Sequence, residues 1–108
     1  MPRFLVIVKY APGGARAIKS SGGTARRAAI EKTITDLGGR LETFDFAFGG
    51  DDSYSVVDLP DQEAAVALTL TVNARGAADA RTVVLLTPEQ LDRAAEREPE
   101  YAPPGQTT

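Results

Sequence analysis

Apolar and polar residues alternate most clearly in the middle of the chain, where the pattern predicts a β-hairpin. Three phenylalanines occupy every second position of the segment Phe44-Asp45-Phe46-Ala47-Phe48. A period of two places their rings on one face of a strand and the intervening side chains on the other. The next segment, Gly49-Gly50-Asp51-Asp52, has the composition of a tight turn, since glycine and aspartate tolerate positive φ. The run at 53–59 therefore predicts the returning strand.

Helical and strand patterns flank the hairpin on both sides. The run Phe4-Leu5-Val6-Ile7-Val8 predicts a strand that is buried on both faces. Ile30, Ile34 and Leu37 recur at helical spacing, and the pair Gly38-Gly39 predicts where that helix ends. In chain order the predicted elements are a strand at 3–9, one helical turn at 15–19, a loop at 20–24 whose Thr24 caps the next helix, a helix at 24–37, strands at 40–48 and 53–59, a helix at 61–75 capped by Asp61, a strand at 81–86 and a short helix at 91–97 begun by Thr87-Pro88-Glu89-Gln90.

This order of elements, βαββαβ plus a short helix, predicts an α+β, ferredoxin-like fold. Its four-stranded antiparallel sheet carries two helices on one face. A length of 108 residues fits one domain, which we place at 1–97. The last segment, 98–108, is rich in proline and predicts an extended C-terminal tail.

Two helices on one side leave the other face of the sheet open. The first strand, the last strand and the phenylalanine row lack a clean polar face, so we expect an apolar sheet surface without a helix over it. We therefore predict that two copies pack their sheets face to face in a homodimer with a closed two-fold arrangement.

Composition narrows the chemistry that the domain can carry. The chain has neither cysteine nor histidine, which excludes thiol nucleophiles, disulfides, a Ser-His-Asp triad and histidine-ligated metals. Asp51 and Asp52 are adjacent acids in a turn without the pattern of a calcium loop, so we predict no metal site there. No cofactor is expected.

Charge is distributed unevenly along the chain. Residues 1–40 carry a net charge of +6 and residues 41–108 a net charge of −9. A solvated face of one sign on each half explains this distribution, and a basic patch for an anionic ligand is the alternative. The acidic overall balance and the lack of a basic-aromatic motif argue against a nucleic-acid partner. The lack of a long apolar run or a signal peptide argues against a membrane, so we expect a cytoplasmic protein.

One basic cluster stands at the predicted start of the first long helix. The loop Ser20-Ser21-Gly22-Gly23-Thr24 is followed closely by Arg26 and Arg27, which oppose the helix dipole at that end. Free backbone N–H groups and two guanidinium groups suit a phosphate or a carboxylate. The alternative is that both arginines point into solvent.

The hairpin offers a second candidate site. With an even-numbered turn, Ala47 lies opposite Tyr54 and Asp45 opposite Val56, so that Asp45 and Tyr54 are diagonal neighbours on one face. An odd-numbered turn or a bulge would reverse these pairings. The predicted lining of a small hydrophobic ligand site is Tyr10, Asp45, Phe46 and Tyr54. The alternative is a structural tyrosine beside a phenylalanine row that belongs to the core.

Several segments together resemble the GYD domain family. They span residues 2 to about 97 and are Pro2-Arg3-Phe4-Leu5-Val6, Leu37-Gly38-Gly39-Arg40-Leu41, Phe48-Gly49-Gly50-Asp51-Asp52-Ser53-Tyr54, Asp58-Leu59-Pro60-Asp61-Gln62-Glu63-Ala64-Ala65 and Arg81-Thr82-Val83-Val84-Leu85-Leu86-Thr87. The family is named for a Gly-Tyr-Asp signature that enters the third strand. That signature is lengthened here, because three residues separate Gly50 from Tyr54, and Ser55 follows the tyrosine in place of the usual aspartate. The resemblance implies the fold of the dimeric α/β-barrel superfamily, which includes cofactor-free monooxygenases, small isomerases and ligand-sensing domains.

Three functions are compatible with this resemblance, because a fold by itself does not fix an activity. The first is a dimeric module that binds or senses a small molecule, and we rank it first. The second is a cofactor-independent enzyme of the oxygenase or isomerase type, which needs an acid or a base. The candidates for that role are Lys9, Tyr10, Asp45, Tyr54 and Asp58. The third is a structural or interaction dimer without a pocket.

Overall fold

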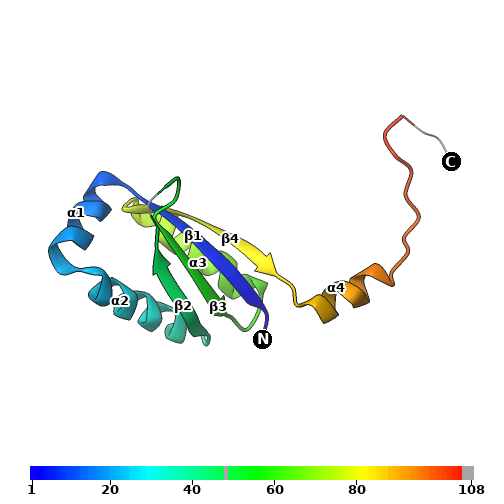
Figure 1. Cartoon of the computed structure of the whole chain (residues 1–108), viewed down its shortest axis with the longest axis horizontal. Coiled ribbons are helices and arrows are strands. Elements are labelled where there is room, and N and C mark those ends of the chain that lie inside the picture. The colour runs from blue at the N-terminus through cyan, green and yellow to red at the C-terminus, as the bar shows by residue number, and fades with distance from the viewer. Residues whose placement is uncertain (48, 106–108) are drawn as a thin grey trace.

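The computed structural model describes residues 1–47 and 49–105. Its body is a sheet with helices on one side, and a C-terminal arm projects away from that body (Figure 1). The elements are β1 (Arg3–Tyr10), α1 (Pro12–Ser21), α2 (Gly23–Asp36), β2 (Arg40–Phe46), β3 (Ser53–Asp58), α3 (Gln62–Arg75), β4 (Ala78–Leu85) and α4 (Pro88–Ala95).

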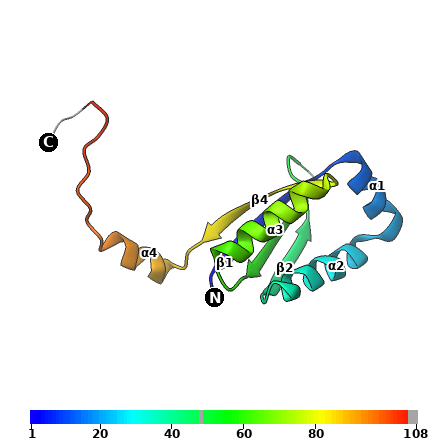
Figure 2. The same ribbon diagram turned by 180° about the vertical axis from the view of Figure 1, so that it is seen from behind.

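The four strands form one sheet in the order β2-β3-β1-β4. Each neighbouring pair is antiparallel. The helices α2 and α3 lie over the same face of the sheet (Figure 2). The predicted α+β, ferredoxin-like βαββαβ arrangement is therefore confirmed, with β1 and β3 in the centre and β2 and β4 at the edges.

The hydrophobic core fills the space between this helix-covered face and the two helices. Phe4 from the central strand β1 is 2% exposed, and Ile34 from α2 is 1% exposed above the sheet. Alternate strand residues point into this layer, as a period of two requires. The buried members of the core are Phe4, Val6, Val8, Ile34, Leu41, Val57, Leu59, Ala65, Leu68, Ala78 and Ala80.

The hairpin forms as predicted, but its register differs. Asp45 pairs with Tyr54 and Phe46 pairs with Ser53. The predicted pairing of Asp45 with Val56 is therefore wrong by two positions. A shift of two residues preserves the faces, so Phe44 and Phe46 still share one face, where they lie opposite Ser55 and Ser53.

The orientation of the phenylalanine row differs from the prediction as well. Phe44 packs against the buried core on the helix-covered face, and its ring meets the Phe46 ring edge to face with centroids 5.1 Å apart. These two rings therefore do not create the open face of the sheet, and the prediction that they demand a second sheet is wrong. Phe48 lies outside the described residues.

The open face carries a different set of side chains. Strand alternation and the observed register give it an apolar centre with charged residues toward the strand ends. The apolar side chains on this face are Leu5, Ile7, Tyr54, Val56, Val83 and Leu85. The charged side chains on it include Arg3, Lys9, Asp45, Asp58, Asp79 and Arg81.

Two elements are longer than predicted. The helix α1 has ten residues instead of a single turn, and only Gly22, with φ of 90°, separates it from α2. Thr24 therefore lies inside α2 and does not cap it. Strand β4 begins at Ala78, three residues earlier than predicted, because its first residues pair with the end of β1. The Asn73 side chain also bonds both backbone groups of Ala80, at 2.7 and 3.1 Å.

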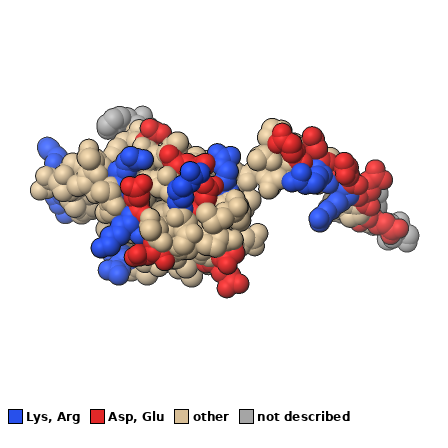
Figure 3. All heavy atoms as spheres, turned by 90° about the horizontal axis from the view of Figure 1, so that it is seen from below, with Lys and Arg blue, Asp and Glu red and all other residues tan. Residues whose placement is uncertain are grey.

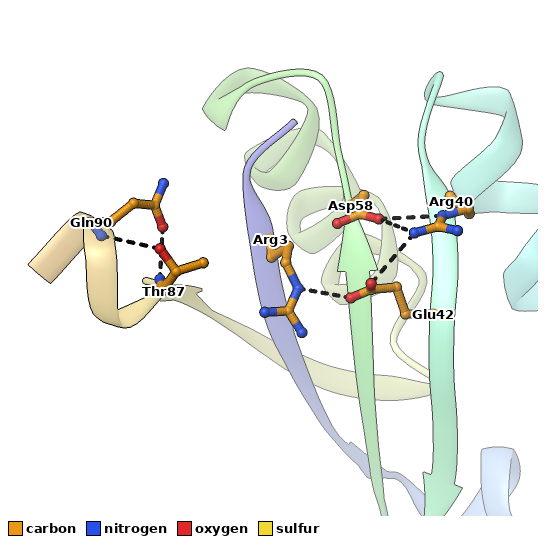
Figure 4. A network of polar contacts seen from close by, with 6 residues as sticks. All are labelled: Arg3, Arg40, Glu42, Asp58, Thr87 and Gln90. Carbon is orange, nitrogen blue, oxygen red and sulfur yellow. Dashed lines mark hydrogen bonds and ion pairs between the residues drawn. The ribbon is translucent and has the colours of Figure 1, made fainter.

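The predicted helix ends at α3 and α4 are confirmed. The Asp61 carboxylate accepts a hydrogen bond from the Ala64 N–H at 2.8 Å, and Gly76 ends α3 in the left-handed conformation. Thr87 and Gln90 form a capping box that begins α4 (Figure 4). These contacts satisfy backbone groups that a helix end would otherwise leave unpaired.

The C-terminal arm, residues 86–105, extends away from the sheet (Figures 1 and 2). Every residue of α4 is exposed, and the molecule reaches 60 Å in its longest dimension. Within the described residues, every helix is too short or too polar to cross a lipid bilayer.

Candidate functional site

The structure divides the four predicted hairpin-site residues between two faces of the sheet. Tyr10 and Phe46 lie on the side of the helices, whereas Asp45 and Tyr54 lie opposite each other on the open face. Alternation along β1 and β2 sets this division, because neighbouring residues of a strand point to opposite faces. The predicted four-residue site is therefore wrong as a single site.

Tyr10 stands at the end of β1, where the turn after β2 folds over it. Its backbone N–H donates to a carboxylate oxygen of Asp52 at 2.8 Å, and the Asp52 N–H donates to the Val8 carbonyl at 2.8 Å. The Tyr10 hydroxyl lies 3.4 Å from Ser53 Oγ. The lengthened turn therefore fixes Tyr10 in place from the hairpin side.

Arg26 reaches Tyr10 from the end of the first turn of α2. Its Cζ atom lies 5.8 Å from the centroid of the Tyr10 ring, a cation–π distance. The Arg26 Nε atom is buried and has no hydrogen-bond partner among the described residues. A buried donor without an acceptor costs about 1–3 kcal/mol, so this position favours a molecule that brings an acceptor.

Two cavities adjoin these side chains. One, of about 350 Å³, lies between α1 and the end of the hairpin, and Phe46, Ala47 and Asp52 form part of its wall. The other, of about 210 Å³, lies between α1 and α2, and Arg26 forms part of its wall. Tyr10 and Ile18 line both cavities, so these two side chains form a wall that the two spaces share.

Glycines let the helices close around this region. A Cβ atom on Gly23 would lie 2.8 Å from the Phe46 ring, and a Cβ atom on Gly14 would overlap the carbonyl oxygen of Ala77. Gly14 is therefore required by close packing against backbone, whereas a side chain at position 23 would have to displace the Phe46 ring. The walls between α1, α2 and the sheet depend on them.

Of the two predicted anion-binding arginines, the structure places only Arg26 at a cavity. Arg27 is exposed on the outer side of α2, since consecutive helical residues point in different directions. The site therefore combines Tyr10 and Phe46 from one prediction with Arg26 from the other. Sequence reasoning missed Ile18 and Asp52, because Ile18 lies in a segment expected to be a single turn and Asp52 was assigned only to the turn.

A larger hollow of about 540 Å³ lies between α3 and β4. Three of its polar side chains have partners, since Thr69 and Thr82 share a hydrogen bond of 2.7 Å and Arg81 pairs with Asp51 at 3.0 Å. Its wall is otherwise mainly apolar. We therefore place the candidate site at Tyr10 and Arg26, where a polar group lacks a partner.

A network of charged residues occupies the other end of the sheet, on the open face (Figure 4). Glu42 pairs with Arg3 at 2.8 Å and with Arg40 at 3.5 Å, and Arg40 also pairs with Asp58 at 3.0 Å. The hydrogen bond from Arg3 to Glu42 raises the pKa of the Arg3 guanidinium. A β-bulge between Leu41 and Thr43 places Glu42 in this network. Within the described residues, acidic side chains do not assemble into a metal-binding cluster.

Comparisons with known proteins identify a family. No curated protein and no solved structure matches the chain. The family model described as GYD domain matches residues 4–95, which cover all eight strands and helices apart from Arg3, the first residue of β1. The chain therefore belongs to the GYD domain family.

Proposed function

We propose that this protein is a homodimeric module that binds or senses a small molecule with an anionic group on an apolar body. The ligand lies at Tyr10 and Arg26, between α1, α2 and the end of the hairpin. A cofactor-independent enzyme would need an acid or a base at this site, and we assign no such role to its residues.

The buried Nε atom of Arg26 carries the proposal. It donates to no described residue, and an arginine that retains its charge beside a cavity suits a carboxylate or a phosphate. The Tyr10 ring holds the guanidinium group from below through the cation–π contact. A bound anion would supply the missing acceptor.

The cavity walls support an apolar body for the ligand. Ile18, Phe46 and Ala47 line the space in front of Tyr10, and the Asp52 carboxylate at its rim is engaged by the Tyr10 N–H. Apolar walls with a few placed polar groups are typical of small-molecule sites. The volume of about 350 Å³ suits a ligand of modest size.

The homodimer is supported by the open face of the sheet. Val83 is 44% exposed and Tyr54 is 37% exposed there, although both belong to strands whose other face is covered. An apolar sheet centre with charges at its ends suits isologous packing of two copies. Sedimentation equilibrium at micromolar concentration tests this, and a monomer alone would contradict it.

The binding proposal is tested with the protein as purified. Native mass spectrometry would reveal a retained small molecule, and ligand-observed NMR with aliphatic and aromatic carboxylates would reveal binding. Arg26→Gln should weaken carboxylate binding by about tenfold or more, because a charge-assisted hydrogen bond contributes about 1.5–3 kcal/mol. Arg27→Gln removes the same charge from the exposed side of α2 and should leave binding unchanged.

Two outcomes would contradict the proposal. One is equal weakening by Arg26→Gln and Arg27→Gln, which would indicate only a general charge effect. The other is no retained molecule and no carboxylate binding by the wild-type protein. Conversion of a bound compound during the NMR measurement would favour the alternative, a cofactor-independent oxygenase or isomerase.

A further inference from the structure

We infer that the C-terminal arm of one copy docks on the α1–α2 helices of a second copy. The arm is residues 86–105, and the docking surface, here called the basic helices, is residues 11–30. The inference builds on the proposed homodimer and adds a second contact to it.

The sequence of the arm specifies a helix, although no part of the body that the structure describes packs against it. Leu91, Ala94 and Ala95 recur at helical spacing on one side of α4, and Leu91 is 59% exposed. The capping box at Thr87 fixes the start of the helix. An isolated helix of eight residues is marginal in water, so this stripe requires a surface to pack against.

Charge identifies that surface. The arm has five acidic and two basic residues, for a net charge of −3, whereas residues 11–30 have four basic residues and no acidic one. In Figure 3 basic side chains gather at the end of the molecule opposite the arm, and acidic side chains follow the arm. Opposite potentials on two surfaces steer them together and fix their register.

The side chains on the surface of the basic helices also suit a docked helix. The outer side of the basic helices carries Arg16, Lys19 and Arg27, and Ala28 is exposed beside Arg27. Ala17 is also exposed and borders the cavity between α1 and α2. Alanines allow a second helix to approach closely, and the basic side chains around them can reach the acids that flank the Leu91 stripe. The two surfaces therefore match in apolar residues as well as in charge.

The geometry of the sheet selects a second copy as the donor of the arm. Arg3 pairs with Leu85 and Tyr10 pairs with Ala78, so the arm leaves the sheet at the end opposite α1. An eight-residue strand spans about 26 Å, which separates an arm from the basic helices of its own chain. A two-fold axis that stacks the strands antiparallel places each arm beside the α1 of the other copy.

Cross-linking between two single-cysteine variants tests the inference directly. The chain has no cysteine, so Ala17→Cys on one chain and Leu91→Cys on an affinity-tagged second chain are unique sites for a short bismaleimide. We expect a cross-linked heterodimer. Thr71→Cys, exposed on α3, replaces Ala17→Cys as the control and should cross-link poorly to the arm.

Charge reversal gives a second readout. Arg16→Glu with Lys19→Glu should raise the dimer dissociation constant by about tenfold, because each exposed pair contributes a few tenths of a kcal/mol and the dimer repeats each pair. Glu89→Lys with Asp92→Lys in the same chain should restore affinity. The control Arg75→Glu with Thr71→Glu and Ala74→Glu makes the same change in net charge at exposed positions of α3, away from the docking surface.

The outcomes separate this inference from the homodimer. A wild-type protein that stays monomeric would contradict the homodimer itself. Arm docking alone would be contradicted if the Arg16→Glu, Lys19→Glu variant and its control variant had the same dimer dissociation constant. It would also be contradicted if Thr71→Cys and Ala17→Cys cross-linked equally well to the arm. A chain carrying both Ala17→Cys and Leu91→Cys that cross-links only within itself would also overturn it.

Discussion

The guanidinium group of Arg26 lies over the ring of Tyr10, with Cζ 5.8 Å from the ring centroid. Tyr10 comes from the end of β1 and lines both cavities, and Arg26 comes from the end of the first turn of α2 and lines the one between α1 and α2. The ring holds the cation while its Nε atom stays without a described partner. The pair is therefore organised before any ligand arrives.

Tyr10→Phe should preserve this organisation. It keeps the ring under Arg26 and removes only a hydroxyl that lies 3.4 Å from Ser53 Oγ, a long hydrogen bond. We expect carboxylate binding within about twofold of wild type, and a loss of stability below about 1 kcal/mol. Tyr10→Leu removes the ring and should weaken binding several-fold, as measured by titration calorimetry. Equal effects of the two substitutions would contradict the role of the ring.

Gly14→Ala should destabilise the fold by about 1–3 kcal/mol, because the added Cβ atom overlaps the backbone carbonyl of Ala77, which cannot swing aside. Gly13→Ala is the matched control. The nearest atom to a Cβ there is the end of the Arg16 side chain at 3.9 Å, so alanine should be neutral or stabilising in α1. Urea denaturation followed by circular dichroism measures both changes. A Gly14→Ala protein as stable as Gly13→Ala would refute this packing.

Val83→Arg should disrupt the proposed homodimer. Val83 is 44% exposed on the open face, on the edge strand β4 beside Leu5, and its replacement would put a cation on the apolar surface that each copy contributes to a two-fold contact. Sedimentation equilibrium should show at least a tenfold increase in the dimer dissociation constant, roughly 1.4 kcal/mol or more. Val66→Arg, on α3 and 55% exposed, should leave association unchanged. A dimer that tolerates Val83→Arg would require another interface.

Glu42→Gln should have a small effect on the isolated chain despite its two ion pairs. Its partners Arg3 and Arg40 have side chains that are 44% and 70% exposed, and exposed pairs contribute about 0.2–1 kcal/mol. We expect a loss of at most about 1 kcal/mol in urea denaturation, diminishing as salt is added. A larger, salt-independent loss would indicate that the network is buried, as in a face-to-face dimer.

The sequence predicted the faces of the hairpin but not its register or its orientation. A period of two places Phe44 and Phe46 together whatever the turn, and a slide of two positions leaves that grouping unchanged. The pairing of Asp45 with Tyr54 depends on turn geometry, in which the Ala47 N–H donates to the Asp52 carbonyl at 2.9 Å. Which face meets the helices depends on long-range packing that no local pattern specifies.

The candidate site was predicted in pieces for a similar reason. Tyr10, Phe46 and Arg26 belong to three elements that are distant in sequence, and only the folded sheet with α1 and α2 brings them together. The helix α1 was underestimated because Gly13 and Gly14 suggest a loop. Gly14 is instead required because a Cβ atom there would overlap the Ala77 carbonyl. This glycine therefore reflects tertiary packing and not a local turn.

The sheet order also bears on how the protein is made. Strand β1 is synthesised first, yet one of its two neighbours is β4, and Arg3 finds its partner only at Leu85. A nascent chain that ends before residue 78 would expose one edge of its central strand, which is a template for unwanted pairing. Productive folding is therefore a late event that needs nearly the whole body of the domain, as expected where the decisive contacts are distant in sequence.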